Sequence, residues 1–256
     1  MVCCCGKEKG RIMHYFFVSP EQINGDKIEV TGENFHHMID VLRIGKQEKF
    51  EVCDGKGKDY LCQIDEQKPS EKRLTACILD TYPSENELPY RLVLYQGLAK
   101  GKKMDEIIQK GTELGISDFV PFESKFCVVH LKEDKTIEKK VERWQKIAKS
   151  AAQQSKRGRV PRVHHPIMLS NLDQLHGKSL IAYENERDYS LKAAVQKWDD
   201  QVDQINILIG PEGGFDEEEV SILENIGVER ISLGKRILRT ETAGVVLCAQ
   251  LNYALE

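Results

Sequence analysis

The stretch that most constrains the fold is INILIGPEGGFD, residues 205–216. An apolar, β-branched run stops at Gly210 and Pro211, passes two further glycines and enters an acidic, helix-like segment at Asp216. This order predicts a buried strand, a glycine-rich loop and a helix. Backbone N–H groups are free at the N-terminus of a helix, and glycines let a ligand approach the main chain closely. The loop is therefore a candidate site for a small polar ligand.

The composition of the loop narrows the kind of ligand. The sequence GPEGG lacks the Gly-Lys-Ser/Thr ending of a P-loop and the spacing of the dinucleotide fingerprint. Pro211 removes one N–H donor, and Glu212 would repel a phosphate. An adenosine with a cationic centre fits these features better than a polyphosphate. A tight turn without any ligand stays open as an alternative, because glycine-rich turns are common.

Composition sets further bounds. The chain has 256 residues, enough for one large or two modest domains, and its 40% hydrophobic content is enough for a packed core. No apolar run reaches the ~18 residues that a membrane span needs, and the N-terminus lacks the apolar segment of a signal peptide, so we expect a cytoplasmic protein without membrane contact. The eight cysteines show no CxxC pair and no metal-ligand spacing with histidines, so we expect reduced thiols and no metal site.

The first third of the chain reads as a small β domain. Residues 1–12 have no pattern and are expected to be a disordered extension. Residues 13–82 predict strands at 15–18, 27–30, 49–53, 60–64 and 75–82, a hairpin turn at 54–57 and one helix at 34–42. We interpret them as a small β-barrel or curled sheet. On and just after its helix, His36, His37 and Arg43 could contact RNA, or could simply be surface residues.

The rest of the chain alternates strands and helices. Residues 83–91 are rich in Pro, Ser, Asn and Glu and are predicted to be a linker. Strands follow at 92–96, 118–122, 180–183, 206–209 and 230–233, with helices at 104–114 and 137–152 among those between them. This pattern predicts an α/β domain over 92–256 with a largely parallel sheet, in which ligands bind beyond the carboxyl ends of the strands. Glu184, Gly210 and Gly234 each follow a strand, so we expect their loops to converge on one pocket.

Charge is distributed unevenly along the chain. Although the net charge is −4, residues 135–165 contain ten Lys or Arg against two Glu. This local excess predicts a positive surface suited to nucleic acid, or only a solvated helix.

The C-terminal segment combines basic residues with an apolar helix. Lys235, Arg236 and Arg239 precede Thr240, a predicted N-cap, and the helix that follows is apolar nearly all round. Such a helix is buried, either under the sheet or in a dimer interface. Because Arg236 and Arg239 come one short loop after a strand end, we expect at least one of them to have a catalytic or binding role.

Four motifs in order resemble one known family. They are KGKKMDEIIQKGTELG at 100–115, RWQKIAKSAAQQSKRGRVP at 143–161, GPEGGF at 210–215 and LGKRILRTETA at 233–243. In addition, HHMIDVLR at 36–43 is similar to the N-terminal domain of the same family. Together they resemble the RsmE family of SPOUT methyltransferases, which transfer a methyl group from S-adenosylmethionine to N3 of a uridine in 16S ribosomal RNA. The resemblance covers residues 13–255.

The resemblance implies a fold, partners and site residues. The fold would be a PUA-like β-barrel RNA-binding domain followed by a trefoil-knotted methyltransferase domain, a rare topology that no periodicity could indicate. The protein would act as a homodimer on the small ribosomal subunit. The residues implied to contact RNA are His36, His37, Arg43, Lys100, Lys103 and Arg157. The residues implied to bind the cofactor are Tyr183, Glu184, Gly210, Pro211, Glu212, Gly213, Leu233, Gly234, Ile237 and Leu238.

Two positions depart from the family pattern. The glycine expected after Ser155 is Lys156, and the Gly-Asp pair expected after Arg43 is replaced by Lys46 and Gln47. Both departures lie outside the cofactor motifs, so they affect the expected RNA contacts and leave the expected reaction unchanged.

The expected catalytic residues are Arg239 and Glu241. Methyl transfer depends mainly on positioning, and uridine N3 must lose a proton. We expect Arg239 to stabilise negative charge on the uracil carbonyl oxygens. Glu241 could accept the proton, but we favour a role in stabilising the helix N-terminus.

Two other function classes are open to such a chain. One is a non-catalytic RNA-binding ribosome-assembly factor, for which loss of S-adenosylmethionine affinity would speak. The other is a nucleotide-dependent oxidoreductase, against which the missing dinucleotide fingerprint speaks.

Overall fold

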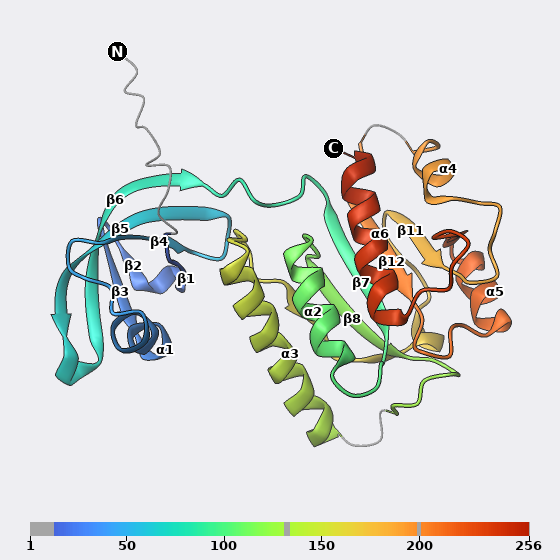
Figure 1. The fold of residues 1–256 in the computed structure, drawn as a ribbon, viewed down its shortest axis with the longest axis horizontal. Coiled ribbons are helices and arrows are strands. Elements are labelled where there is room, and N and C mark those ends of the chain that lie inside the picture. Colours follow the sequence, from blue (N-terminus) through green and yellow to red (C-terminus); the bar gives the residue numbers. More distant parts are fainter. Residues whose placement is uncertain (1–12, 131–133, 199–200, 256) are drawn as a thin grey trace, which may run out of the picture. The chain divides into compact units, whose positions relative to one another are not determined.

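The computed structural model describes residues 13–130, 134–198 and 201–255, so the extension predicted at residues 1–12 lies outside the described part. The chain divides into two compact units: unit 1 ends at Asn86 and unit 2 begins at Glu87 (Figure 1). This division falls inside the segment 83–91 that was predicted to be a linker.

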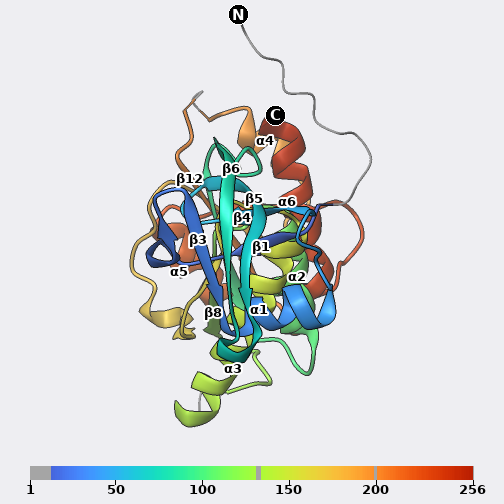
Figure 2. The ribbon, with the colours of Figure 1, turned by 90° about the vertical axis from the view of Figure 1, so that its left-hand side faces the viewer.

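Unit 1 is a curled six-stranded sheet (Figure 2). Its strands and short 3-10 helices are β1 (Tyr15–Phe17), η1 (Pro20–Gln22), β2 (Ile23–Asn24), β3 (Lys27–Thr31), β4 (Lys49–Cys53), β5 (Lys58–Lys68), η3 (Pro69–Glu71) and β6 (Arg73–Pro83). The strand order is β1-β4-β5-β6-β3-β2, and all neighbours are antiparallel except β1 and β4. Asp54 closes the predicted β4–β5 turn, because its Oδ1 accepts hydrogen bonds from the N–H groups of Lys56 and Lys58.

The predicted helix of unit 1 is confirmed, but it changes its hydrogen-bonding pattern partway. The α-helical turn α1 (Gly32–His36) continues into the π-helical segment η2 (His37–Val41). Phe35 and Met38 point into the core of the unit, where Phe16 and Phe50 meet edge to face with ring centroids 6.1 Å apart. The sheet therefore has a core of its own.

Unit 2 is an α/β domain whose described strands all pair in parallel, as predicted. Its elements are β7 (Arg91–Gly97), α2 (Lys103–Glu113), β8 (Asp118–Glu123), α3 (Asp134–Gln154), β9 (Arg162–Val163), β10 (Ile167–Met168), η4 (Leu169–Asn171), β11 (Lys178–Ala182), α4 (Leu191–Val195), β12 (Gln204–Ile209), α5 (Glu217–Asn225), β13 (Glu229–Ile231) and α6 (Thr240–Leu255). The strand order is β10-β8-β7-β12-β11-β13, and β9 pairs with β8.

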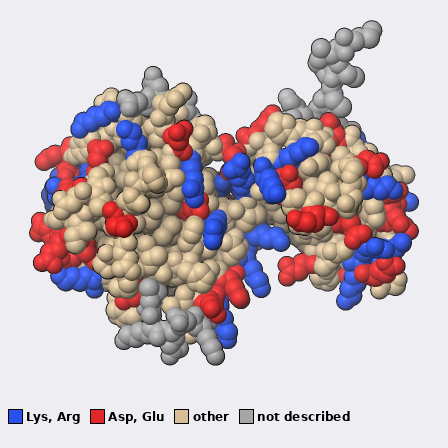
Figure 3. Space-filling view, turned by 180° about the vertical axis from the view of Figure 1, so that it is seen from behind, with Lys and Arg blue, Asp and Glu red and all other residues tan. Residues whose placement is uncertain are grey.

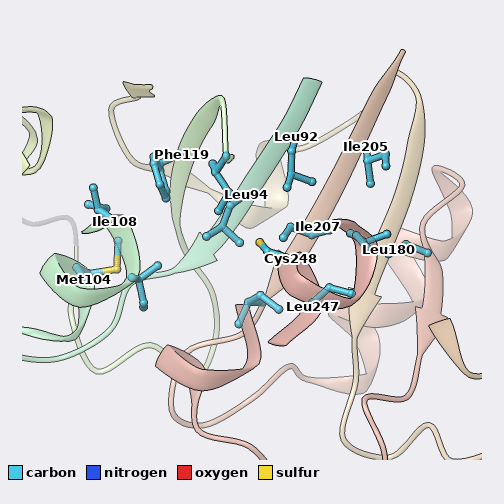
Figure 4. Packing of buried hydrophobic residues seen from close by; sticks show 14 of the residues in the cluster. Leu92, Leu94, Met104, Ile108, Phe119, Leu180, Ile205, Ile207, Leu247 and Cys248 are labelled. Carbon is cyan, nitrogen blue, oxygen red and sulfur yellow. The ribbon is translucent and has the colours of Figure 1, made fainter. Parts of the chain in front are cut away.

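Helices cover both faces of this sheet because the strands are apolar on both sides. In β12, Ile205 and Ile207 face the larger core cluster, which α2, α3 and α6 complete, whereas Leu208 faces the cluster formed with α5. Figure 4 shows Leu247 and Cys248 of α6 packed against the strands on the face with the larger core cluster. The C-terminal helix is thus buried along one side under the sheet.

Lys156 occupies a backbone position that favours glycine. It follows α3 with φ +55°, the left-handed conformation that commonly ends a helix. The N–H of Lys156 bonds to the carbonyl of Gln153, and that of Arg157 to the carbonyl of Ala152. This is the Schellman pattern, and it gives a physical reason for a glycine there.

A charge cluster around the buried Asp118 lies at the amino ends of β7 and β8. Asp118, which is 7% exposed, accepts hydrogen bonds from Arg91 at 2.9 Å and pairs with Nε2 of His164 at 2.7 Å. Burial pushes the pKa of Asp118 up, but these two partners outweigh it and hold the pKa below its usual value.

Candidate active site

The carboxyl ends of four neighbouring strands form the candidate site. β7, β12, β11 and β13 are adjacent and parallel, so the segments that follow them meet at one edge of the sheet (Figure 1). The N–H of Tyr183, after β11, donates to the carbonyl of Ile231 in β13 at 3.2 Å. The residues predicted to bind a cofactor at 183–184, 210–213 and 233–234 therefore lie at the same edge, and their binding role stays a prediction.

Residues 210–214, called here the glycine loop, are packed too closely for side chains at two glycines. A β-carbon on Gly213 would lie 2.7 Å from Cβ of Phe126, and one on Gly214 would lie 2.2 Å from Oε1 of Glu184. Gly214 also has φ +71°. Downstream, α5 follows the loop as the sequence predicts, and Asp216 is its N-cap, with its side chain accepting from the N–H of Glu218.

A buried hydrogen-bond chain ties this loop to its neighbours. Nε2 of Gln96 donates to Oγ1 of Thr240 at 2.8 Å, and the Thr240 hydroxyl donates to the carbonyl of Gly210 at 2.6 Å. A β-carbon on Gly97 would lie only 2.4 Å from the nitrogen of Pro211. Thr240 was predicted to be an N-cap; instead α6 begins at Thr240 itself, and its hydroxyl bonds to the adjacent loop.

Lys103 joins two carboxylates that the sequence assigned to different roles. Its Nζ lies 3.0 Å from Oε1 of Glu212 and 3.4 Å from Oε2 of Glu241. The N–H of Lys100 donates to the same Oε1 of Glu212 at 3.0 Å. The hydrogen bond to Glu212 raises the pKa of Lys103. Burial pushes the pKa of Glu212 up, yet the N–H of Lys100 and the ammonium of Lys103 hold it below its usual value.

Arg239, the predicted catalytic cation, is exposed just before α6. Its carbonyl accepts the N–H groups of Thr242 and Ala243, both at 2.8 Å, so the backbone is fixed while the side chain has no ion pair among the described residues. In the loop before it, Ile237 is 87% exposed and Leu238 is half-buried. The apolar side chain of Ile237 therefore also faces outward at this edge.

The RNA candidates of unit 1 differ in how available they are. Nδ1 of His36 lies 2.6 Å from Oδ2 of Asp40, and both side chains are exposed. His37 is half-buried, with its ring edge to face with that of Phe16 at 5.8 Å. Arg43 is exposed, with φ +53°. Contact of these three residues with RNA stays a prediction.

The structure contradicts the RNA contact that was predicted for Arg157. This residue is 3% exposed, and its guanidinium makes two hydrogen bonds to the carboxylate of Glu87, at 2.8 and 2.7 Å. It also donates to the carbonyls of Thr112, at 2.8 Å, and Ile116, at 3.0 Å. The prediction that Arg157 contacts RNA is wrong for this structure, because the charged group is buried and already bonded within unit 2.

Gln96 is a residue of the site that the sequence analysis missed, although the sequence contains an indication of it. Gln96 ends the otherwise apolar run of β7 and is fully buried, and a polar residue in such a run needs a partner. Its Oε1 has no hydrogen-bond partner among the described residues. Gln96 and Thr240 are therefore the buried polar support of the glycine loop.

A hollow of about 460 Å³ lies away from the glycine loop. Its lining residues are Glu186, Tyr189, Lys197, Glu224, Gly227, Val228, Glu229 and Arg230. It borders the edge strand β13 and contains no residue of the glycine loop, so it is not the pocket predicted for the three strand-end loops.

The described ranges show neither a metal-binding cluster nor a helix that could span a membrane. No group of three or more His, Cys, Asp or Glu side chains there is arranged to hold a metal ion. None of the helices in those ranges is long and apolar enough to cross a bilayer. The described cysteines are free thiols, and burial raises the pKa of Cys248 to about 12.

Comparison with known proteins gives consistent results over both units. Residues 86–252 match the RNA methyltransferase domain family, and residues 30–74 match the RNA methyltransferase PUA domain. The chain is 37% identical over 233 residues to ribosomal RNA small subunit methyltransferase E of Bacillus subtilis, covering 89% of this chain and 90% of the relative.

Solved structures of similar proteins agree with these sequence matches. The chain superposes with a TM-score of 0.82, at 30% identity, on ribosomal RNA small subunit methyltransferase E from Neisseria gonorrhoeae bound to S-adenosyl methionine, covering 94% of this chain and 98% of the other. A Legionella pneumophila protein in complex with the same cofactor gives a TM-score of 0.83 at 26% identity, covering 95% and 98%. With a PUA-like first unit, a parallel α/β second unit and these matches, the chain belongs to the RNA methyltransferase family that includes ribosomal RNA small subunit methyltransferase E.

Proposed function

We propose that this enzyme methylates N3 of a specific uridine in 16S ribosomal RNA of the small subunit, with S-adenosylmethionine as the methyl donor. One observation carries the proposal. Four strand ends of unit 2 meet around a tight glycine loop, and the exposed Arg239 lies just before α6, whose first residue, Thr240, bonds to that loop. The cofactor of the Neisseria gonorrhoeae structure and the name of the Bacillus subtilis relative support the donor and the RNA class.

The residues at this edge fit the proposed cofactor. Gly213 and Gly234 expose their backbone, and nothing lies within 4 Å of a β-carbon placed on Gly234, whose φ is +109°. Leu233 and Leu238 are half-buried apolar side chains suited to an adenine ring. When bound, S-adenosylmethionine supplies an electrophilic methyl group on a sulfonium. The chain's part is to hold the adenosine with backbone groups and to align the target base.

Arg239 is proposed to act on the target base. Removal of the N3 proton places negative charge on the uracil carbonyl oxygens, and a fixed cation there stabilises the transition state by about 3–4 kcal/mol. Because the side chain of Arg239 is exposed and has no ion pair in the described part of the chain, it is available for this contact. Glu241 is paired with Lys103 at the start of α6, which supports a structural role over that of proton acceptor.

The test is methyl transfer to small ribosomal subunits from a strain that lacks the enzyme, with tritium-labelled S-adenosylmethionine and nucleoside analysis. We expect label in N3-methyluridine with the wild type and a fall of about 10²–10³-fold in kcat for Arg239→Ala. Arg236→Ala is the matched control, because Arg236 is exposed in the same loop. Label in another nucleoside would refute the substrate assignment, and an equal loss in both variants would refute the assigned role of Arg239.

The proposed RNA surface includes the solvent side of α3. Lys139, Lys140, Lys146 and Lys149 are exposed on this helix, and Arg143 pairs with Asp105 of α2. On the face that Figure 3 shows, positive and negative side chains are intermixed. We therefore assign RNA contact to local groups of basic and polar side chains on each unit, His36, His37 and Arg43 included.

The remaining proposals concern assembly. We propose a homodimer, because Tyr253 of α6 and Ile237 are 86% and 87% exposed and would be covered by a second copy; light scattering of the purified protein tests this. We also propose that unit 2 carries the trefoil knot of the SPOUT fold, because residues 86–252 match the RNA methyltransferase domain family. We further propose that the enzyme acts in the cytoplasm, where its ribosomal substrate is.

A further inference from the structure

We infer that Lys103 is a positioning residue, which fixes the glycine loop to the start of α6 and does not bind RNA. The inference rests on the proposed function, because it concerns the site that would bind the cofactor and the target uridine. It replaces the RNA-binding role that the sequence resemblance implies for this lysine.

The geometry places Lys103 between three segments that are far apart in the chain. It is the first residue of α2, Glu212 lies in the glycine loop, and Glu241 is the second residue of α6. The ammonium lies 3.0 Å from Oε1 of Glu212 and 3.4 Å from Oε2 of Glu241. One cation therefore joins the loop beside β12 to the helix that Arg239 precedes.

Partial burial makes this arrangement stronger than an ordinary surface ion pair. The side chains of Lys103 and Glu212 are each 28% exposed, and that of Glu241 is 17% exposed. Oε2 of Glu241 is buried and makes no hydrogen bond in the described structure, so the nearby ammonium is the charge that compensates it. Without Lys103, two carboxylates would face each other in a partly desolvated place and would move apart.

The same charges disfavour RNA contact at Lys103. The cluster of one ammonium and two carboxylates has a net negative charge, and it would repel a phosphate group. Glu212 also accepts the N–H of Lys100, so its carboxylate is held in place by the backbone and is not easily displaced. An RNA phosphate would have to compete with both carboxylates for the same ammonium.

Three variants separate positioning from RNA binding. Lys103→Met removes the charge but keeps the apolar stem, and Lys103→Arg keeps a cation that can pair with both carboxylates. Lys110→Met is the matched control, because Lys110 lies on the same helix with an exposed ion pair to Glu106 at 4.0 Å. Circular dichroism checks that each variant is folded.

The measurements are the S-adenosylmethionine dissociation constant by calorimetry, kcat with small ribosomal subunits, and the salt dependence of subunit binding. For Lys103→Met we expect about tenfold weaker cofactor binding, about tenfold lower kcat and an unchanged slope of log affinity against log salt. Lys103→Arg should recover most of both losses, and Lys110→Met should match the wild type.

Two other outcomes overturn the inference, and a third separates it from the proposed substrate. A slope that falls by about 0.7–0.9 in Lys103→Met, with cofactor affinity unchanged, would make Lys103 a phosphate ligand. No change in any measurement would make it an ordinary surface lysine. If the wild type transfers no methyl group but Lys103→Met still weakens cofactor binding, the proposed substrate fails while the positioning role stands.

Discussion

Replacing Arg157 by methionine is expected to destabilise unit 2 without a specific loss of RNA affinity. Methionine keeps the apolar stem and removes the guanidinium. The variant leaves the carboxylate of Glu87 without its bidentate partner and the carbonyls of Thr112 and Ile116 without their donor.

The size of the effect follows from burial. Breaking a buried ion pair from one side costs about 3–5 kcal/mol. The side chain of Glu87 is 23% exposed, so water can partly solvate the carboxylate that remains. We therefore expect a loss near the lower end, about 3 kcal/mol in the free energy of unfolding.

Tryptophan fluorescence during urea unfolding is a suitable assay, because both tryptophans, Trp144 and Trp198, lie in unit 2. For a slope of about 2–3 kcal/mol per M, the midpoint should fall by about 1–1.5 M. Arg159→Met is the control, since Arg159 is exposed two residues further on. The reasoning is refuted if Arg157→Met unfolds within about 0.5 kcal/mol of the wild type while its affinity for small subunits drops.

Three further predictions use the same unfolding assay. Thr240→Val should cost about 1–3 kcal/mol because it leaves the carbonyl of Gly210 without its buried donor, whereas Thr240→Ser should stay near the wild type; equal losses would mean that the hydroxyl is not responsible. Lys156→Gly should stabilise unit 2 by about 0.5–1 kcal/mol by relieving the left-handed backbone, and a loss of stability would contradict this account. The lowered pKa of Asp118 means that its ionised form stabilises the fold above its unfolded pKa, and that this contribution is lost as the pH falls through the folded value, below about pH 4. Asp118→Asn should therefore be less stable than the wild type at pH 7, with the difference shrinking in acid, and a difference that is independent of pH would refute this.

The longer strands could be predicted because their apolar pattern is regular. β4 has the bounds that were predicted, 49–53, and the strand, glycine loop and helix around Gly210 occur in the expected order. The strands β2, β9 and β10 have two residues each, too few to show any periodicity. They are defined by the neighbours with which they pair.

The candidate site was harder to predict, because residue type does not reveal a partner. A basic residue in a basic stretch can bind a phosphate or a buried carboxylate. Arg157 pairs with Glu87, which is 70 residues away in the chain, and Lys103 pairs with Glu212 because the fold brings α2 and the glycine loop together. The positions of the strand-end residues were predictable because parallel strands place all their carboxyl ends at one edge. The hydrogen bonds and ion pairs between those residues could not be predicted from the sequence.

The central strand pair has a consequence for biosynthesis. β7 pairs with β12 from Arg91 to Gln96, and Arg91 is 113 residues ahead of its partner Gln204. At a synthesis rate of about 5–20 residues per second, β7 is synthesised roughly 6–23 s before β12. During that interval one edge of an apolar strand is open, while unit 1, whose strands all lie earlier in the chain, can already fold. We expect a nascent chain stopped before residue 204 to stay bound to chaperones, and a chain that includes β12 to close the sheet and be released.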